Sequence, residues 1–406
     1  MTLFSGSTIA QFIPVFISPI LSRLFSPEEF GKLALFIALT TFVSGFMTGS
    51  YDMALMLPKR KNDALHVLAI SLLLSLLTSL FVGIIFVVFG ENIASYAGDV
   101  SVERYLLLAP VIVMLIGAYK TLNIWFTRYK NYGLLASTRI GQAFAGSATK
   151  LASGFAGFGF DGLVASVLIQ NIVGSGILVY NFIRKEGAKL KVISRHGIVN
   201  NAKDYKDFPK YSAPQGMLDM VNKNGFIFVF SSFYGVGALG LFDFGVGKVL
   251  KPLQMLGPSL SQVFYEKASQ LRKTNECVWP LAKNILRLLI GVNALIVLIM
   301  LFWGPIIFAT VFGPEWEVAG VYARIVTPWF SMRFISSTLS TIPVLYSKQK
   351  EYFRKMFFLN LSIPGILLVL GTLHIDLSTS LFVISSFATI YLALLILWFR
   401  RISSAS

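Results

Sequence analysis

Long apolar blocks dominate the chain and are separated by short polar segments. Twelve blocks are long enough to cross a bilayer, because a transmembrane helix needs about 20 mainly apolar residues. The expected spans are residues 2–22, 33–55, 65–89, 105–125, 133–154, 162–183, 212–233, 239–262, 284–303, 320–343, 353–371 and 378–399. The pattern predicts an all-α polytopic membrane protein of about twelve transmembrane helices. Because the first block begins abruptly at Met1, we expect a short cytoplasmic leader before it in the native protein.

The composition leaves little room for a soluble domain. Of the 406 residues, 55% are hydrophobic and only 13% are charged, a balance far from that of ordinary soluble domains. The single cysteine, Cys277, cannot form an internal disulfide, and the three histidines do not have metal-ligand spacing. The sequence contains neither a carboxylate pair nor a nucleophile–base spacing. We therefore expect no enzyme activity, no catalytic residue, no metal and no cofactor.

The distribution of Lys and Arg predicts the orientation, since cytoplasmic loops retain these residues. Most of the 35 cations lie in one alternate set of loops, above all in residues 184–210, whereas the opposite loops carry acids such as Glu91 and Glu315. This bias predicts a multi-pass protein of the bacterial inner membrane with both termini in the cytoplasm. It also accounts for most of the net charge of +16, so nucleic acid is not an expected partner.

The longest polar stretch divides the expected spans six and six. We therefore predict an N-terminal lobe at residues 1–186, a cytoplasmic linker at 187–211 and a C-terminal lobe at 212–406. An even number of spans in each half makes the halves parallel repeats, an arrangement that many alternating-access carriers use. Such carriers place the substrate between the two halves, which predicts a central cavity.

Cations outnumber acids inside the expected spans, with eight lysines or arginines against three aspartates. Each cation at mid-membrane costs roughly 2.5–3.5 kcal/mol, so these side chains must pair, snorkel or face a cavity. Lys120 and Arg324 lie near helix ends and are expected to snorkel. The excess of cations predicts an anionic substrate. The candidate substrate-binding residues are Arg139, Lys150, Lys223, Lys248, Lys251 and Arg333.

Helical spacing refines these candidates. Arg139 and Lys150 should share one face of the fifth span with Gln142 and Gly146, which forms a polar stripe. Lys248 and Lys251 share a face of the eighth span, and Lys223 can pair with Asp219 one turn earlier. The buried acids are candidates for ion coupling or for salt bridges. These acids are Asp52, Asp219 and Asp243.

Several segments, taken in order, resemble one family of membrane transporters. The matching segments are Gly6–Gln11, Ser18–Gly31, Tyr51–Pro58, Asp207–Ser212, Gln262–Phe264 and Arg324–Phe330. Together they resemble the polysaccharide transport family of Wzx-like oligosaccharide flippases, which belongs with the MATE exporters and the lipid II flippase MurJ. The resemblance covers nearly the whole chain and rests on the order of the segments, because no single one is a signature.

The resemblance implies two six-helix lobes that move undecaprenyl-pyrophosphate-linked repeat units of O-antigen, capsule or exopolysaccharide to the periplasmic leaflet. It implies the lipid-linked glycan and the bilayer as partners, together with a polysaccharide polymerase and a chain-length regulator. One alternative is a MATE-type drug or cation antiporter, whose substrates favour acids rather than cations in the lobes. Another is a membrane polysaccharide polymerase or ligase, but the longest expected periplasmic loop, residues 90–104, is short and acidic.

Overall fold

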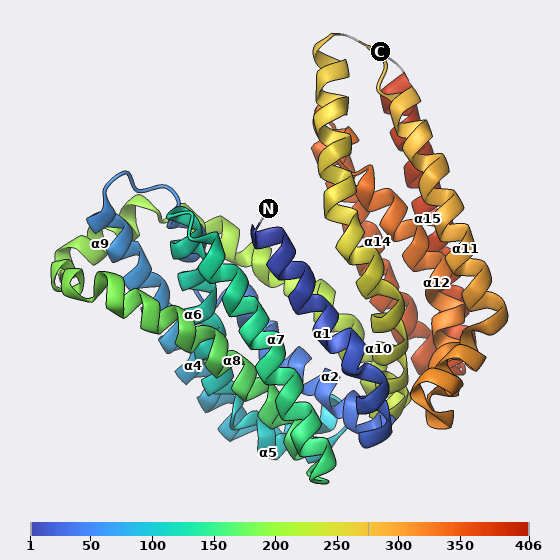
Figure 1. The fold of residues 1–406 in the computed structure, drawn as a ribbon, viewed down its shortest axis with the longest axis horizontal. Coiled ribbons are helices and arrows are strands. Elements are labelled where there is room, and N and C mark those ends of the chain that lie inside the picture. Colours follow the sequence, from blue (N-terminus) through green and yellow to red (C-terminus); the bar gives the residue numbers. More distant parts are fainter. Residues whose placement is uncertain (1, 275, 405–406) are drawn as a thin grey trace. The chain divides into compact units, whose positions relative to one another are not determined.

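The computed structural model describes residues 2–274 and 276–404, and across these residues it contains helices and no β-strand. The predicted all-α polytopic fold is confirmed. The chain forms two compact units, Met1–Gly237 and Ala238–Ser406, which Figure 1 draws as two groups of helices. Seven of the described helices are long and apolar enough to cross a membrane.

The first unit contains ten helices or helical segments and several short turns. Their bounds are α1 Thr2–Leu24, α2 Pro27–Phe42, η1 Val43–Gly45, α3 Tyr51–Ala54, α4 Lys61–Tyr96, η2 Val100–Val102, α5 Glu103–Leu106, α6 Ala109–Arg128, α7 Tyr132–Phe155, α8 Gly159–Glu186, η3 Gly187–Val192, α9 Arg195–Asp204, η4 Phe208–Ser212 and the first part of α10 Ala213–Lys273. Within this unit α7 lies between α1 and α8 (Figure 1).

The second unit contains the rest of α10 and the remaining helices. Their bounds are α11 Trp279–Phe312, η5 Pro314–Trp316, α12 Glu317–Thr338, α13 Ile342–Leu345, α14 Gln349–Thr372 and α15 Leu377–Ser404. Here α12 packs against both α11 and α15. Only 11% of the most apolar window of α11 is buried, so most of this apolar surface needs lipid around it.

The second expected span, residues 33–55, is not one helix, which corrects the sequence prediction. Helix α2 ends at Phe42, and the chain continues through the 3₁₀ turn η1 before α3 begins. The Thr40 and Thr41 hydroxyls donate to backbone carbonyls one turn earlier, which bends helices. Gly49 and Ser50 are both left-handed, with φ of 57° and 58°. Two successive left-handed residues redirect the chain and place α3 inside the unit.

Three further spans also differ from the prediction. The expected seventh and eighth spans run on as α10, which is interrupted at Gly235, where φ is 79° and ψ is 162°. That conformation is open essentially to glycine alone. The tenth expected span, residues 320–343, ends its helix α12 at Thr338 and continues as the short α13. By contrast, the turn between α1 and α2 has the hydrogen bonds that its Ser-x-x-Glu pattern predicts. Ser26 and Glu29 form a capping box at the start of α2.

Small residues fix the register of α4 against α6. Ser71 and Ser79 of α4 stand two turns apart, with Ser75 between them on the same face. The Ser71 hydroxyl lies 2.7 Å from that of Thr121, and Ser79 donates to the carbonyl of Pro110. Ser75 packs so closely on Gly117 that an added Cβ there would clash. Such small residues let membrane helices approach closely.

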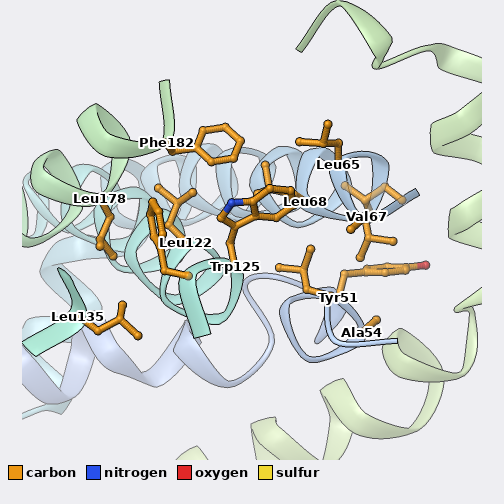
Figure 2. Close-up of a cluster of buried hydrophobic side chains, with 14 residues drawn as sticks. Tyr51, Ala54, Leu65, Val67, Leu68, Leu122, Trp125, Leu135, Leu178 and Phe182 are labelled. Atoms are coloured by element: carbon orange, nitrogen blue, oxygen red, sulfur yellow. The ribbon is translucent and has the colours of Figure 1, made fainter. Parts of the chain in front are cut away.

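A buried apolar cluster joins five helices of the first unit. Trp125 of α6 is only 1% exposed and meets the ring of Phe182 of α8 edge to face, with centroids 5.4 Å apart. Figure 2 shows Trp125 among Leu122, Leu68 and Phe182, with Tyr51 of α3 at the far side of the cluster. Each buried side chain of this size contributes roughly 1.5–3 kcal/mol. The cluster therefore anchors α3, α4, α6, α7 and α8 to one another.

The expected linker, residues 187–211, packs against the first unit. The backbone N–H of Ser194, just before α9, donates to Nε2 of His66 on α4, and Tyr51 donates to the carbonyl of Ala202 in α9. Lys61 and Glu186 form a salt bridge of 2.5 Å beside them. The first part of α10 also belongs to this unit. The expected bounds, an N-terminal lobe at 1–186, a linker at 187–211 and a C-terminal lobe at 212–406, stay a prediction.

A cationic cavity in the first unit

A polar cavity of about 600 Å³ lies within the first unit. Its walls come from four places in the sequence: the connection between α2 and α3, the second half of α6, the start of α7 and the start of α10. The lining residues are Ser44, Gly45, Ser50, Asp52, Met53, Ile116, Tyr119, Lys120, Asn123, Ile124, Arg139, Ser212, Gln215, Gly216 and Met220. The interruption of α2 therefore builds one wall of the cavity.

Asp52 is the single acid among the described lining residues and is almost completely buried, with a side chain 2% exposed. Its neighbours Tyr51 and Ala54 belong to the apolar cluster and fix α3 in place. The carboxylate accepts a hydrogen bond of 2.5 Å from the Thr48 hydroxyl. It also forms a salt bridge of 3.3 Å with the Lys120 ammonium. Burial of a carboxylate is tolerated when it is paired and hydrogen-bonded in this way.

Lys120 and Asn123 reach the cavity from one face of α6, while Leu122 and Trp125 enter the apolar cluster on the other. The Lys120 side chain is 38% exposed, so its ammonium is both paired with Asp52 and open to the cavity. We expected Lys120 to snorkel to the membrane surface. Instead the pairing with Asp52 keeps it inside the unit.

Arg139 joins the cavity from α7, one turn after the buried Leu135. Arginine presents planar donors that match phosphate and carboxylate oxygens. With Lys120 it gives two cations against the Asp52 carboxylate, so the formal charges of the described lining residues sum to +1. Serine, asparagine, glutamine and tyrosine side chains supply further hydrogen-bonding groups. The arrangement can bind an anion together with a neighbouring hydroxyl-rich group.

Helix α10 closes the cavity on one side through unusually close backbone contact. An added Cβ at Gly45 would meet the carbonyl of Gly216, and one at Gly216 would meet that of Gly45. Beside them, the Ser44 hydroxyl lies 3.5 Å from the sulfur of Met220. Only glycine at both positions lets η1 and α10 approach this closely.

Comparison with known proteins identifies the family. The profile of a family described as polysaccharide biosynthesis protein matches residues 20–321. The chain belongs to this polysaccharide biosynthesis protein family. No curated protein sequence matches the chain. The family match covers all the described residues that line the cavity, including those of α3, α6 and α7.

Solved structures of transporters share the fold at low sequence identity. A multidrug resistance MATE family transporter of the MOP superfamily, in its inward-facing conformation, is 13% identical with a TM-score of 0.64, over 99% of this chain and 94% of that one. The MATE multidrug transporter DinF-BH, in complex with R6G, is 15% identical with a TM-score of 0.63, over 100% and 97%. A MOP superfamily transporter from Pyrococcus furiosus, described as having a binding pocket of reverse polarity, is 13% identical with a TM-score of 0.58, over 99% and 95%. This polysaccharide biosynthesis family member therefore has a transporter fold.

The candidate substrate-binding residues and buried acids predicted from the sequence lie in different places in this family member. Arg139 and Asp52 both line the cavity. Lys150 is on the same helix as Arg139 but is not part of the lining, and the expected polar stripe between them is used for packing. Gln142 lies against Gly174 of α8, and Gln170 of α8 lies against Gly146.

The remaining candidates lie outside this cavity or outside the described side chains. Arg333 is near the end of α12 with an exposed side chain, and Asp243 is on the part of α10 that belongs to the second unit. The side chains of four other candidates are outside the described part of the chain. They are Asp219, Lys223, Lys248 and Lys251. Their proposed roles stay predictions.

Proposed function

We propose that this protein is a flippase for lipid-linked oligosaccharides whose linkage is a negatively charged pyrophosphate. The observation that carries the proposal is the cavity lined by Arg139 and by Lys120, which is paired with the buried carboxylate of Asp52. Membership of the polysaccharide biosynthesis family and the transporter fold support a role in moving a glycan precursor across a membrane. The substrate is undecaprenyl-pyrophosphate-linked repeat units, delivered from the cytoplasmic to the periplasmic leaflet by alternating access.

Each part of such a substrate has a matching surface. The pyrophosphate accepts hydrogen bonds from Arg139 and Lys120, and charge-assisted bonds of this kind are the strong ones in proteins. Sugar hydroxyls meet the neutral polar side chains, among them Asn123, Gln215 and Ser212. A pyrophosphate diester carries about two negative charges, and each gains roughly 2.3 kcal/mol per 100 mV on leaving an inside-negative compartment. The membrane potential therefore favours export.

Reconstitution tests this proposal directly. The purified protein is placed in liposomes with a lipid-pyrophosphate-linked oligosaccharide, and transfer of the glycan from the accessible to the protected leaflet is measured with and without a membrane potential. Transfer that needs the protein and is accelerated by voltage supports the proposal. Absence of transfer, together with uptake of organic cations, would instead favour a MATE-type antiporter.

A pair of arginine substitutions ties the result to the cavity. Arg139→Ala removes a charge-assisted hydrogen-bond donor, so transfer should fall about tenfold or more. Arg195→Ala removes an equal charge from an exposed position at the start of α9 and is the matched control. If both variants transfer glycan like the unchanged protein, the cavity is not the anion site.

A further inference from the structure

A second cavity in the first unit is apolar. It measures about 460 Å³, and the described lining is made of hydrophobic and aromatic side chains from α2 and η1, from α4 and from α10. The lining residues are Leu39, Phe42, Val43, Phe46, Phe81, Val82, Ile85, Phe86, Ile93, Tyr96, Ala97 and Phe228. Phe81 at its edge is 59% exposed, so the pocket reaches the outer surface of the unit. Neither the anion nor the sugar of the proposed substrate would use such a pocket, because it offers them no hydrogen-bond partners.

The apolar pocket and the cationic cavity share one wall, the 3₁₀ turn η1. Val43 and Phe46 line the pocket, whereas Ser44 and Gly45 between them line the cavity. Side chains three residues apart in a 3₁₀ turn point the same way, which explains why Val43 and Phe46 share a side. The two chambers are therefore adjacent across a single turn of chain.

The α4–α6 register gives their order along the membrane normal. The cavity uses α6 from Ile116 onward, and this part of α6 pairs with α4 near Ser71 and Ser75. The pocket begins on α4 at Phe81, beyond the contact of Ser79 with Pro110 at the other end of α6. With the predicted orientation, the cavity is nearer the cytoplasm, and the part of the pocket lined by Phe81, Val82, Ile85 and Phe86 lies in the outer half of the bilayer.

We propose that the apolar pocket binds the isoprenoid chain of the lipid-linked substrate while the cavity holds its pyrophosphate. This inference rests on the flippase function proposed above. A lipid in the cytoplasmic leaflet points its hydrocarbon chain from the headgroup toward the opposite leaflet, which is the order of cavity and pocket in the first unit. The occupant is this chain rather than an ordinary acyl chain, because the pocket lies directly across η1 from the cavity proposed to hold the pyrophosphate.

Filling the pocket with a larger side chain tests the proposal. Ile85 lines the pocket, and the adjacent Ile84 does not and is 64% exposed. Ile85→Trp should weaken binding of undecaprenyl pyrophosphate to the purified full-length protein about tenfold, equivalent to losing roughly two buried methylene groups. Binding of inorganic pyrophosphate should not change. Ile84→Trp makes the same substitution on the lipid-facing side and should leave both affinities unchanged.

Photocrosslinking of the unchanged protein provides a second measurement that does not depend on the folding of a variant. An undecaprenyl pyrophosphate analogue with a photoreactive group in its chain should label residues of the pocket lining, such as Phe42, Ile85 and Phe228, and excess phosphatidylglycerol should not prevent it. Labelling elsewhere, equal competition by phosphatidylglycerol, or equal effects of the two tryptophan variants would overturn the inference and leave the flippase proposal standing. Failure of the unchanged protein to bind any lipid pyrophosphate would overturn both.

Discussion

The salt bridge between Asp52 and Lys120 should respond unequally to loss of its two members. The Asp52 side chain is 2% exposed and the Lys120 side chain is 38% exposed. Lys120→Met leaves a buried carboxylate without its cation, a change that costs about 3–5 kcal/mol. We expect the lower end, about 3 kcal/mol, because Thr48 still donates to the carboxylate. Asp52→Asn instead leaves an ammonium that water in the cavity can reach, so the expected loss is about 1 kcal/mol or less.

Thermal unfolding of the purified variants in one detergent measures this difference. Trp125 is the only tryptophan of the first unit, and the other five lie in the second, so unfolding is followed by circular dichroism rather than by tryptophan fluorescence. The melting temperature should fall clearly more for Lys120→Met than for Asp52→Asn. The double variant should resemble Asp52→Asn alone, because removing the carboxylate relieves the loss of its partner. Equal losses in the two single variants, or additive losses in the double variant, would refute the reasoning.

Three shorter predictions concern the backbone and a helix cap. Gly216→Ala places a methyl group against the carbonyl of Gly45 in η1 and should cost about 1–3 kcal/mol of stability. Gly225→Ala on the same helix has open space around its methyl group and should be tolerated. The melting temperatures of the two variants test this difference. Gly235→Ala forces alanine into a backbone conformation that essentially only glycine adopts, and should lower stability by about 1–3 kcal/mol. Gly237 also has open space around it but has no positive φ, so Gly237→Ala should not lower stability. Asp376 accepts a backbone hydrogen bond at the start of α15, which lowers the pKa of its carboxyl. The cap is therefore stabilising above the ordinary aspartate pKa and is lost as the pH falls through the lowered one. The melting difference between the unchanged protein and Asp376→Ala should accordingly be present at pH 7 and shrink below about pH 4.

Much of the fold was predictable because membrane spans depend on a local property, the length of an apolar block. Apart from residues 33–55, each expected span is largely helical in the structure. The break in that span depends on hydroxyls of Thr40 and Thr41 and on two left-handed residues. The enrichment of Thr, Ser and Gly between Thr40 and Ser50 is the available signal. Hydrophobicity alone cannot detect it, since such residues also occur in regular membrane helices.

The site was less predictable because it depends on contacts between distant segments. Arg139 was expected at a substrate site from its place within a span, and the structure puts it in the cavity lining. Lys120 was assigned to the membrane surface because it lies near a helix end, and only the approach of α3 reveals Asp52 as its partner. The helical stripe from Arg139 to Lys150 was geometrically reasonable, but spacing cannot say which neighbour a face meets. Gln142 meets the adjacent α8 instead.

Two kinds of contact hold the cavity together, and one determines its charge while the other determines its shape. Asp52, Thr48 and Lys120 form a charged network that fixes where a positive group faces the cavity. Gly45 and Gly216 form a wall of bare backbone that carries no charge. A change at Lys120 therefore alters the attraction for an anion while α10 keeps its place, whereas a methyl group at Gly216 displaces the wall and leaves the charges unaltered. If anion binding alone limits transfer, the Lys120 change must be the more damaging of the two at equal loss of stability.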